Sequence, residues 1–166
     1  MIRRLWKGGV PVLPLSFLVF LPVSAGADVL AATTLEDDIE IARLDVPEGT
    51  GWCVLWNHSV KGFPVSDCYE NQAGHMVLVH SHLPDFAAGL DHIPGRGRQV
   101  SDGEGGYFIL DINEPVPGDA YVLRPGAGPV NHRLQVGDQI VSLSAVAPHQ
   151  RVRIALKRNE DDDDDH

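Results

Sequence analysis

Apolar and polar residues alternate with a period of two along most of this chain, which limits the folds that are open to it. Nine short segments share this alternation, are rich in β-branched or aromatic residues, and are separated by Gly, Pro, Asn or Asp. These segments are residues 39–46, 51–58, 64–71, 75–82, 106–112, 119–124, 132–136, 139–144 and 151–157. The pattern predicts an all-β fold, a single-domain antiparallel sandwich or barrel of about eight or nine short strands with one long loop.

The long loop is expected between His82 and Gly106, where the alternation stops for longer than an ordinary connection requires. Its one candidate helical turn covers residues 85–90, and its apolar residues are expected to hold it against the domain. Arg96 and Arg98 flank a single glycine near the crest, and two guanidinium groups so spaced suit a bound carboxylate. The alternative is that both arginines are solvated charges on a glycine-rich turn.

The N-terminal residues 1–27 have the features of a secretory signal peptide. Three basic residues precede an apolar run at 10–23, which ends in the small residues Ala25-Gly26-Ala27. The alternative is an uncleaved anchor, but the run is shorter than the roughly 20 residues of a spanning helix and is interrupted by prolines. We therefore expect a periplasmic protein, secreted through this signal, with no stable membrane insertion after cleavage.

The remaining chain is expected to comprise an N-terminal extension at 28–38, a β domain at 39–158 and an acidic disordered tail at 159–166. The tail reads NEDDDDDH, and its carboxylates repel one another while offering nothing apolar to bury. Loose capture of divalent cations is the alternative role for it. Calcium sites, however, need ligands spaced around a loop.

Charge excludes several classes of partner. Without residues 1–27 the chain has 10 Lys and Arg against 23 Asp and Glu, a formal net charge of 10 − 23 = −13. A protein this acidic repels phosphate backbones and anionic lipid surfaces. Nucleic acid is therefore not an expected partner.

Cys53 and Cys68 are the only two cysteines, and export would place them in an oxidising compartment. A bridge between them across an antiparallel hairpin would close a loop of about 15 residues and disfavour the unfolded chain by about 3 kcal/mol. This register would pair Trp52 with Tyr69, Val54 with Asp67, and Trp56 with Val65. The alternative is two independently buried thiols.

The histidines raise the question of a metal site. His80 and His82 lie two residues apart on one predicted strand and would point to the same face, with His75 just before them. A third ligand could come from His58, His92 or His132 after folding. Spacing of this kind arises often by chance in a chain with eight histidines, and no His-Glu-x-x-His motif supports it. We therefore expect no metal and no cofactor.

Nucleophilic catalysis is not indicated either. Ser59 directly follows His58, so the two are neighbours in sequence and not the parts of a nucleophile elbow, and the chain has no Gly-x-Ser-x-Gly motif. The expectation is a protein that is not an enzyme.

The predicted hairpin resembles a known family. The run His58-Ser59-Val60, then Pro64-Val65, then Asp67 and Tyr69, is similar to the His-Ser-Val…Pro-Val-x-Glu-x-aromatic signature of the bacterial domain of unknown function family 1850. Later blocks of the chain are also similar to the family, namely FAAGL at 86–90, GEGGYFI at 103–109, NHRLQVGDQIVSL at 131–143 and RVRIAL at 151–156. The chain departs from the pattern by Asp67 in place of Glu, by its two cysteines, by the longer loop and by the acidic tail.

This resemblance implies a role beside a transporter. Family members are small exported proteins whose genes commonly neighbour those of TAXI-type TRAP transporters, which take up small organic acids. The expectation is a non-enzymic periplasmic accessory whose partner is the TRAP permease or its solute-binding protein. A free-standing periplasmic binder of a small anion or metal ion is the alternative.

The binding residues that the resemblance implies are His58, Ser59 and Asp67, in a polar site at one end of the hairpin. In the disulfide register His58 and Asp67 are four residues out of line, on the order of 13 Å. They would meet only if the loop curls back or the register differs. Otherwise they have separate structural roles, with His58 capping the turn and Asp67 accepting backbone N–H bonds.

Overall fold

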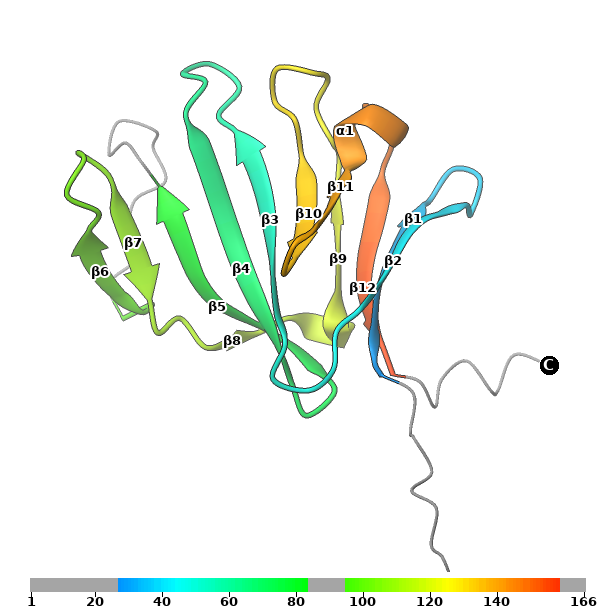
Figure 1. The fold of residues 1–166 in the computed structure, drawn as a ribbon, viewed down its shortest axis with the longest axis horizontal. Coiled ribbons are helices and arrows are strands. Elements are labelled where there is room, and N and C mark those ends of the chain that lie inside the picture. The colour runs from blue at the N-terminus through cyan, green and yellow to red at the C-terminus, as the bar shows by residue number, and fades with distance from the viewer. Residues whose placement is uncertain (1–26, 84–94, 159–166) are drawn as a thin grey trace, which may run out of the picture.

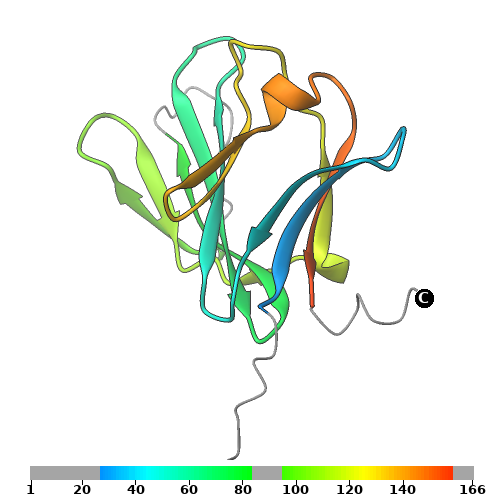
Figure 2. The same ribbon diagram turned by 45° about the vertical axis from the view of Figure 1, so that its right-hand side comes forward.

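Two antiparallel β-sheets packed face to face form the domain in the computed structural model, which describes residues 27–83 and 95–158 (Figures 1 and 2). The smaller sheet contains β2 (Glu40–Asp45), β1 (Val29–Thr34), β12 (Val152–Lys157) and β9 (Ala120–Leu123), in that spatial order. The larger sheet runs in the order β11 (Gln139–Ser142), β10 (Arg133–Val136), β3 (Gly51–Asn57), β4 (Pro64–Gln72), β5 (His75–Leu83), β7 (Tyr107–Leu110) and β6 (Arg98–Ser101), and the short β8 (Glu114–Pro115) also pairs with β5. The expected sandwich is thus confirmed, and the sheets do not close into a barrel.

Within residues 27–83 and 95–158, helical structure is confined to two short connections. The 3₁₀ helix η2 (Pro117–Asp119) leads from β8 of the larger sheet to β9 of the smaller, and α1 (Leu143–Val146) leads from β11 to β12. In α1 the Ser142 hydroxyl accepts a hydrogen bond from the Ala145 N–H and so caps the helix start. No helix in the described part of the chain has the length and apolar character needed to cross a lipid bilayer.

All nine predicted segments form strands, and the described part of the chain contains three further strands that were not predicted. The segment expected to be an N-terminal extension, residues 28–38, contains β1, which pairs with both β2 and β12. The extension is therefore part of the β domain. The side chains of β1 are buried on both faces of the sheet, so its Val-Leu-Ala-Ala run is continuously apolar. For this reason β1 lacks the alternating pattern from which the other strands were predicted.

The other two unpredicted strands are very short. β6 lies within the expected long loop and pairs with β7, and β8 has only two residues. Residues 84–94 lie outside the described part of the chain, and so do the helical turn expected at 85–90 and the apolar residues expected to anchor the loop.

The main core fills the space between the two sheets. Its central side chain is Trp52 on β3, which is 1% exposed. Buried residues of both sheets and of α1 surround it: Leu30, Ala32, Leu44, Val46, Val54, Met76, Leu134, Leu143, Ala147, Val152, Ile154 and Leu156. Each fully buried Leu or Ile contributes roughly 1.5–3 kcal/mol, so this cluster supplies most of the force that holds the sheets together. A second cluster lies against β4, β5 and β7 and contains Val65, Leu78, Leu83, Tyr107, Ile109 and Ile112.

Asn71, at the end of β4, is a fully buried polar side chain that links the two sheets. Its amide nitrogen donates to the Asp28 carboxylate at 2.8 Å and to the Val46 carbonyl at 2.7 Å. Its oxygen accepts from the Gly74 N–H at 2.9 Å, within the β4–β5 turn. One side chain thereby ties the β4–β5 turn to both ends of the β1–β2 hairpin.

The register of β3 against β4 is the one expected from the cysteines. Cys53 is directly opposite Cys68, and the two sulfurs form a disulfide. Trp52 is therefore opposite Tyr69, and their rings stack with centroids 5.9 Å apart. The predicted bridge and its register are confirmed.

The bridge generates a first prediction. The double substitution Cys53→Ser/Cys68→Ser should lower the free energy of unfolding by about 3 kcal/mol, because the unfolded chain regains the freedom of the closed loop. Urea denaturation with and without reductant measures this loss. Wild-type protein denatured without reductant should show no free thiol, and two titratable thiols in protein taken from the periplasm would contradict the assignment.

Asn71 generates a second prediction. Asn71→Ala should lower the free energy of unfolding by about 2–3 kcal/mol, because it leaves the Gly74 N–H and the Val46 carbonyl buried without partners. Gln72→Ala is the matched control, since Gln72 is the exposed neighbour and should change stability by less than about 0.5 kcal/mol. Equal losses for both variants, measured by thermal and urea unfolding, would show that Asn71 does not link the sheets.

Candidate binding cleft between the sheets

His58 lies in the exposed turn between β3 and β4 and holds that turn together. Its Nδ1 accepts hydrogen bonds from the Val60 N–H at 3.3 Å and the Lys61 N–H at 3.2 Å. Its ring packs against Phe63 with centroids 5.0 Å apart. Ser59 is exposed beside it. The geometry matches the alternative that His58 caps the turn.

Asp67 is placed elsewhere, on the inner face of β4 opposite Val54. Its Oδ1 accepts a hydrogen bond at 2.5 Å from the hydroxyl of Ser81 on β5, and not from the backbone N–H groups that the sequence suggested. Because the hairpin keeps the disulfide register along its whole length, His58 and Asp67 stay four residues out of line. The structure therefore does not bring His58 and Ser59 into one site with Asp67.

Arg96 and Arg98 each pair with a carboxylate of the protein itself. Arg96 Nε donates to Glu114 Oε2 at 2.6 Å, and Arg98 Nε donates to Asp111 Oδ2 at 3.3 Å. Gly97 between them has a φ of +68°, and a Cβ there would lie 2.5 Å from the Leu110 carbonyl oxygen, so only glycine fits. The sharp bend sends the two guanidinium groups to different acids. Arg96 is also close enough to Asp67 to favour its ionised form.

The histidines considered as metal ligands also separate. His82 Nε2 is 2.9 Å from Asp102 Oδ2, and its ring stacks on Phe108 with centroids 4.3 Å apart. His75, at the start of β5, pairs with Asp119 at 3.2 Å. Among the residues that the structure describes, neither His75 nor His82 belongs to a cluster of three metal-ligating side chains, and His92 lies outside this part of the chain. The hydrogen bond from His82 and those from two backbone N–H groups lower the pKa of the Asp102 carboxyl.

Between the two sheets lies a partly open cleft of about 200 Å³. One wall comes from β3 and β4 of the larger sheet, and the opposite wall comes from β9 of the smaller sheet. The residues that line it are Val54, Trp56, Asp67, Tyr69, Tyr121, Leu123 and His132. Asp67, one of the binding residues proposed from the sequence, lines this cleft, and so does His132, which the sequence analysis considered as a metal ligand.

Stacked aromatic rings shape the cleft. The rings of Tyr69 and Tyr121 stack across the gap between the sheets, with centroids 5.3 Å apart and planes inclined by 14°. Trp56 and His132 stack on the same side, with centroids 5.9 Å apart. Rings held in this way by neighbouring rings present fixed apolar surfaces to whatever enters.

Asp67 is the one carboxyl group of the cleft. Burial raises its pKa, and this effect exceeds the opposing influences of the Ser81 hydrogen bond, Arg96 and His80. The neutral form of Asp67 is therefore more favoured than that of an exposed aspartate. Burial also raises the pKa of Tyr69 and Tyr121, so both hydroxyls stay protonated.

His132 adds a neutral donor. Burial lowers its pKa, and its Nδ1 accepts a hydrogen bond from the Gly126 N–H at 3.1 Å. The proton of the neutral ring is therefore on Nε2, which can donate. The Ser144 hydroxyl accepts the backbone N–H of His132 at 2.7 Å and fixes the residue at the start of β10.

The buried hydroxyl of Tyr121 has no hydrogen bond of ordinary geometry with any described residue. It is close enough to the Tyr69 hydroxyl for the two groups to affect each other's pKa. A buried hydroxyl without a hydrogen bond of ordinary geometry costs free energy.

Most of the cleft was not predicted as a site. Tyr121 and His132 fall in or beside predicted strands, and the alternation indicates which residues share a face of each strand. It does not indicate which strand of the other sheet lies opposite. The aromatic residues Trp56 and Tyr69 therefore stood out in the sequence only as paired residues of one hairpin.

The chain matches a known protein family over much of its β domain. The family model described as Domain of unknown function (DUF1850) matches residues 53–143, which is more than half of the 166 residues. The matched stretch contains all the residues that line the cleft. No curated protein and no solved structure matches the chain.

The raised pKa of Asp67 generates a third prediction. A carboxyl whose pKa is higher in the folded than in the unfolded protein favours folding below its unfolded pKa, and that contribution is lost as the pH rises through the folded value. Asp67→Asn should therefore be more stable than wild type at pH 7 and about equal to it near pH 3. Each unit between the two pKa values corresponds to about 1.4 kcal/mol.

Urea denaturation at several pH values between these limits measures the difference. Asp45→Asn is the control, because Asp45 is an exposed aspartate on a strand and should show no such pH-dependent gain. A loss of stability at pH 7 in Asp67→Asn would mean that the charged hydrogen bond to Ser81 outweighs burial.

Proposed function

The chain belongs to the DUF1850 family, and from this premise we propose that it is a non-enzymic periplasmic accessory of a TAXI-type TRAP transporter for small organic acids. The observation that carries the proposal is the family match over residues 53–143, together with the export signal expected at residues 1–27. Proteins with this hairpin signature are expected beside such transporters. Its partners would be the permease or the solute-binding protein.

The cleft supports a binding role within this proposal. Its volume of about 200 Å³ is below the roughly 300–1,000 Å³ of pockets for drug-sized ligands, so it suits a small molecule. Aromatic walls would cover the carbon skeleton of an organic acid. The Nε2–H of His132 would donate to its carboxylate, and uptake of a proton by Asp67, which the raised pKa of Asp67 favours, would remove the repulsion of an anion.

Binding without chemistry is the role that the polar groups support best. The Ser81 hydroxyl already donates to Asp67, and Ser81 is only 5% exposed, so it is poorly placed to attack a bound molecule. One ring nitrogen of His132 accepts a hydrogen bond from the backbone N–H of Gly126. Among the described residues, the His132 side chain has no hydrogen bond to a serine or a cysteine that it could activate. The cleft therefore offers recognition groups and not an activated nucleophile.

The proposal generates a fourth prediction. Deleting the gene in its host should lower uptake of the transporter's labelled substrate while the amount of permease, measured by immunoblot, stays the same. Removing residues 1–27, so that the protein stays in the cytoplasm, should reproduce the deletion. Truncation after Arg158 should leave uptake nearly unchanged, because the acidic residues beyond it are expected to add no buried surface.

Adjacent residues of β9 provide a matched pair for the cleft. Tyr121→Ala should weaken binding of the substrate by purified protein, because it removes one of the two stacked walls, whereas Val122 is 53% exposed and Val122→Ala should not. Calorimetric titration measures the binding, and melting temperatures exclude unfolding as the cause.

The alternative is a free-standing periplasmic binder of a small anion. The cleft favours it as well, because recognition there requires no transporter. Normal uptake in the deletion strain, with no second family member to compensate, would overturn the accessory role. Retained binding of organic acids by the purified protein would then support the free-standing binder.

A further inference from the structure

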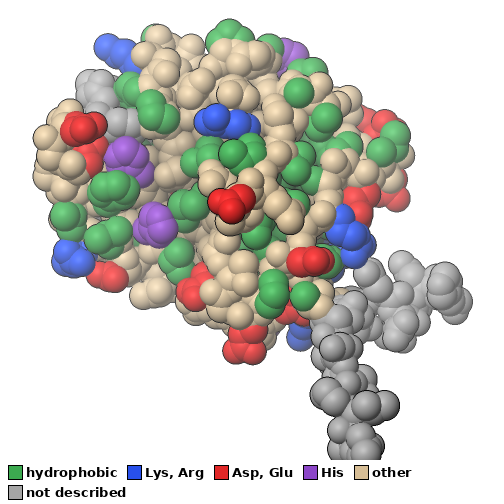
Figure 3. Space-filling model, viewed as in Figure 1, with side chains coloured by type: hydrophobic (Ala, Val, Ile, Leu, Met, Phe, Trp, Pro, Cys, Tyr) green, Lys and Arg blue, Asp and Glu red, His purple; other side chains and the backbone are tan. Residues whose placement is uncertain are grey.

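A row of side chains crosses the outer face of the larger sheet on three adjacent strands. The register places Cys53 of β3 opposite Cys68 of β4, and Cys68 opposite His80 of β5. All three side chains are therefore on the face that is turned away from the core and the cleft. Histidine and hydrophobic side chains lie close together on this side of the molecule (Figure 3).

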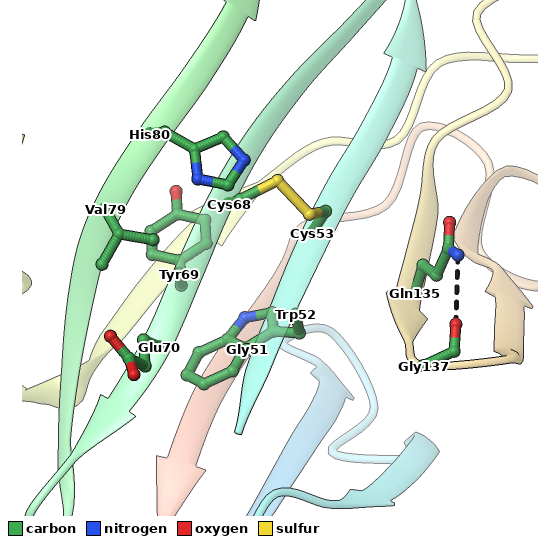
Figure 4. Close-up of a pocket in the computed structure, with 10 residues that line it drawn as sticks. All are labelled: Gly51, Trp52, Cys53, Cys68, Tyr69, Glu70, Val79, His80, Gln135 and Gly137. Carbon is green, nitrogen blue, oxygen red and sulfur yellow. Dashed lines mark hydrogen bonds between the residues drawn. A yellow bond between two sulfur atoms is a disulfide. The ribbon is translucent and has the colours of Figure 1, made fainter. Parts of the chain in front are cut away.

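The row lines a groove of about 380 Å³ between β5 and the β10–β11 hairpin (Figure 4). In Figure 4 the imidazole of His80 lies beside the disulfide, and Glu70 lies farther along the same groove. Gln135 and Gly137 line the side of the groove that the β10–β11 hairpin forms.

The ligand atoms of the row are already close to one another. One ring nitrogen of His80 and the sulfurs of Cys53 and Cys68 all lie within 4.8 Å of each other. Around a zinc ion with Zn–S bonds of about 2.3 Å and Zn–N bonds of about 2.0–2.1 Å, tetrahedral ligand atoms lie roughly 3.5 Å apart. Small side-chain rotations would suffice to close the three ligands around one ion.

His80 differs from the other histidines of β5. His75 and His82 are each paired with an aspartate, whereas His80 forms no hydrogen bond with another residue in the described part of the chain. Its half-buried ring faces the sulfurs instead. An imidazole beside two sulfurs that has no hydrogen bond to another described residue is available as a third ligand.

We propose that Cys53, Cys68 and His80 bind one Zn²⁺ when the disulfide is reduced. In the disulfide the two sulfurs share a bond and carry no thiolate charge, so the oxidised protein does not offer them as ligands. An external dithiol supplies two electrons and two protons: the S–S bond breaks, two thiols form, and the dithiol becomes a disulfide. Zn²⁺ then replaces the two thiol protons and forms two Zn–S bonds and one Zn–N bond.

The surroundings favour a cation in this position. Two thiolates and an imidazole are ligands that zinc prefers, and the open groove leaves its fourth position to water. The chain is acidic overall, with a formal net charge of −10, and the Glu70 carboxylate lines the same groove. The inference does not depend on the transporter role, because it concerns the opposite face of the sheet from the cleft.

Zinc binding to the full-length secreted protein without a histidine tag tests the proposal. The protein is reduced, and the reductant is then removed under anaerobic conditions. The reduced protein is titrated with Zn²⁺ in competition with a chromophoric chelator, and the oxidised protein is titrated in the same way as a control. The reduced protein should bind one equivalent and the oxidised protein none. Co²⁺ in place of Zn²⁺ should give the sulfur-to-metal charge-transfer absorption of thiolate ligation.

Matched variants identify the ligands. Loss of an outer-shell partner weakens metal binding roughly 10–100-fold. His80→Ala removes a direct ligand, so it should weaken Zn²⁺ binding to the reduced protein by more than this. His75→Ala removes a histidine from the same strand and should leave the affinity unchanged. Cys53→Ser/Cys68→Ser should abolish both zinc binding and the Co²⁺ absorption.

Melting curves of the reduced protein with and without Zn²⁺ separate a folded site from binding to unfolded chain. A rise in melting temperature that His80→Ala removes supports the site. Equal affinity of wild type and His80→Ala, or no zinc bound after reduction, would overturn it. A reduced protein that is unfolded and is not refolded by Zn²⁺ would overturn it too.

Discussion

The antiparallel register of β3 against β4 determines which side chains lie on the inner face of the larger sheet and which lie on its outer face. Side chains alternate along a strand, so a shift of one residue would move every inner side chain to the outer face. The Cys53–Cys68 bridge holds one register, with Trp52 against Tyr69 inside and the sulfurs outside. The core, the cleft and the outer groove all follow from that single alignment.

The cleft on the inner face of the larger sheet contains a few polar groups among aromatic side chains. Asp67 replaces what would be a further apolar contact opposite Val54, and burial disfavours its charge. The Ser81 hydroxyl and Arg96 offset part of that cost. The Tyr121 hydroxyl remains without a hydrogen-bond partner of ordinary geometry among the described residues.

The outer face depends on the same strands but on different chemistry. His82 is committed to Asp102 and Phe108, which hold the β6–β7 turn against β5. His80, two residues earlier, faces the disulfide instead. His80 and His82 lie on the same face of β5 but differ in their availability as metal ligands, because the neighbouring strands offer them different partners.

The local sequence pattern determined most of the strands of this protein and the register of one hairpin. The alternation predicted nine strands, because each strand buries one face whatever its partner is, and the two cysteines predicted the β3–β4 register. The tertiary structure decided the rest. It made β1 a strand buried on both faces, and it gave Arg96 and Arg98 separate acids. It also placed Tyr121 of one sheet against Tyr69 of the other. These are contacts between segments far apart in the chain, and a period of two specifies which face a side chain occupies but not what lies across from it.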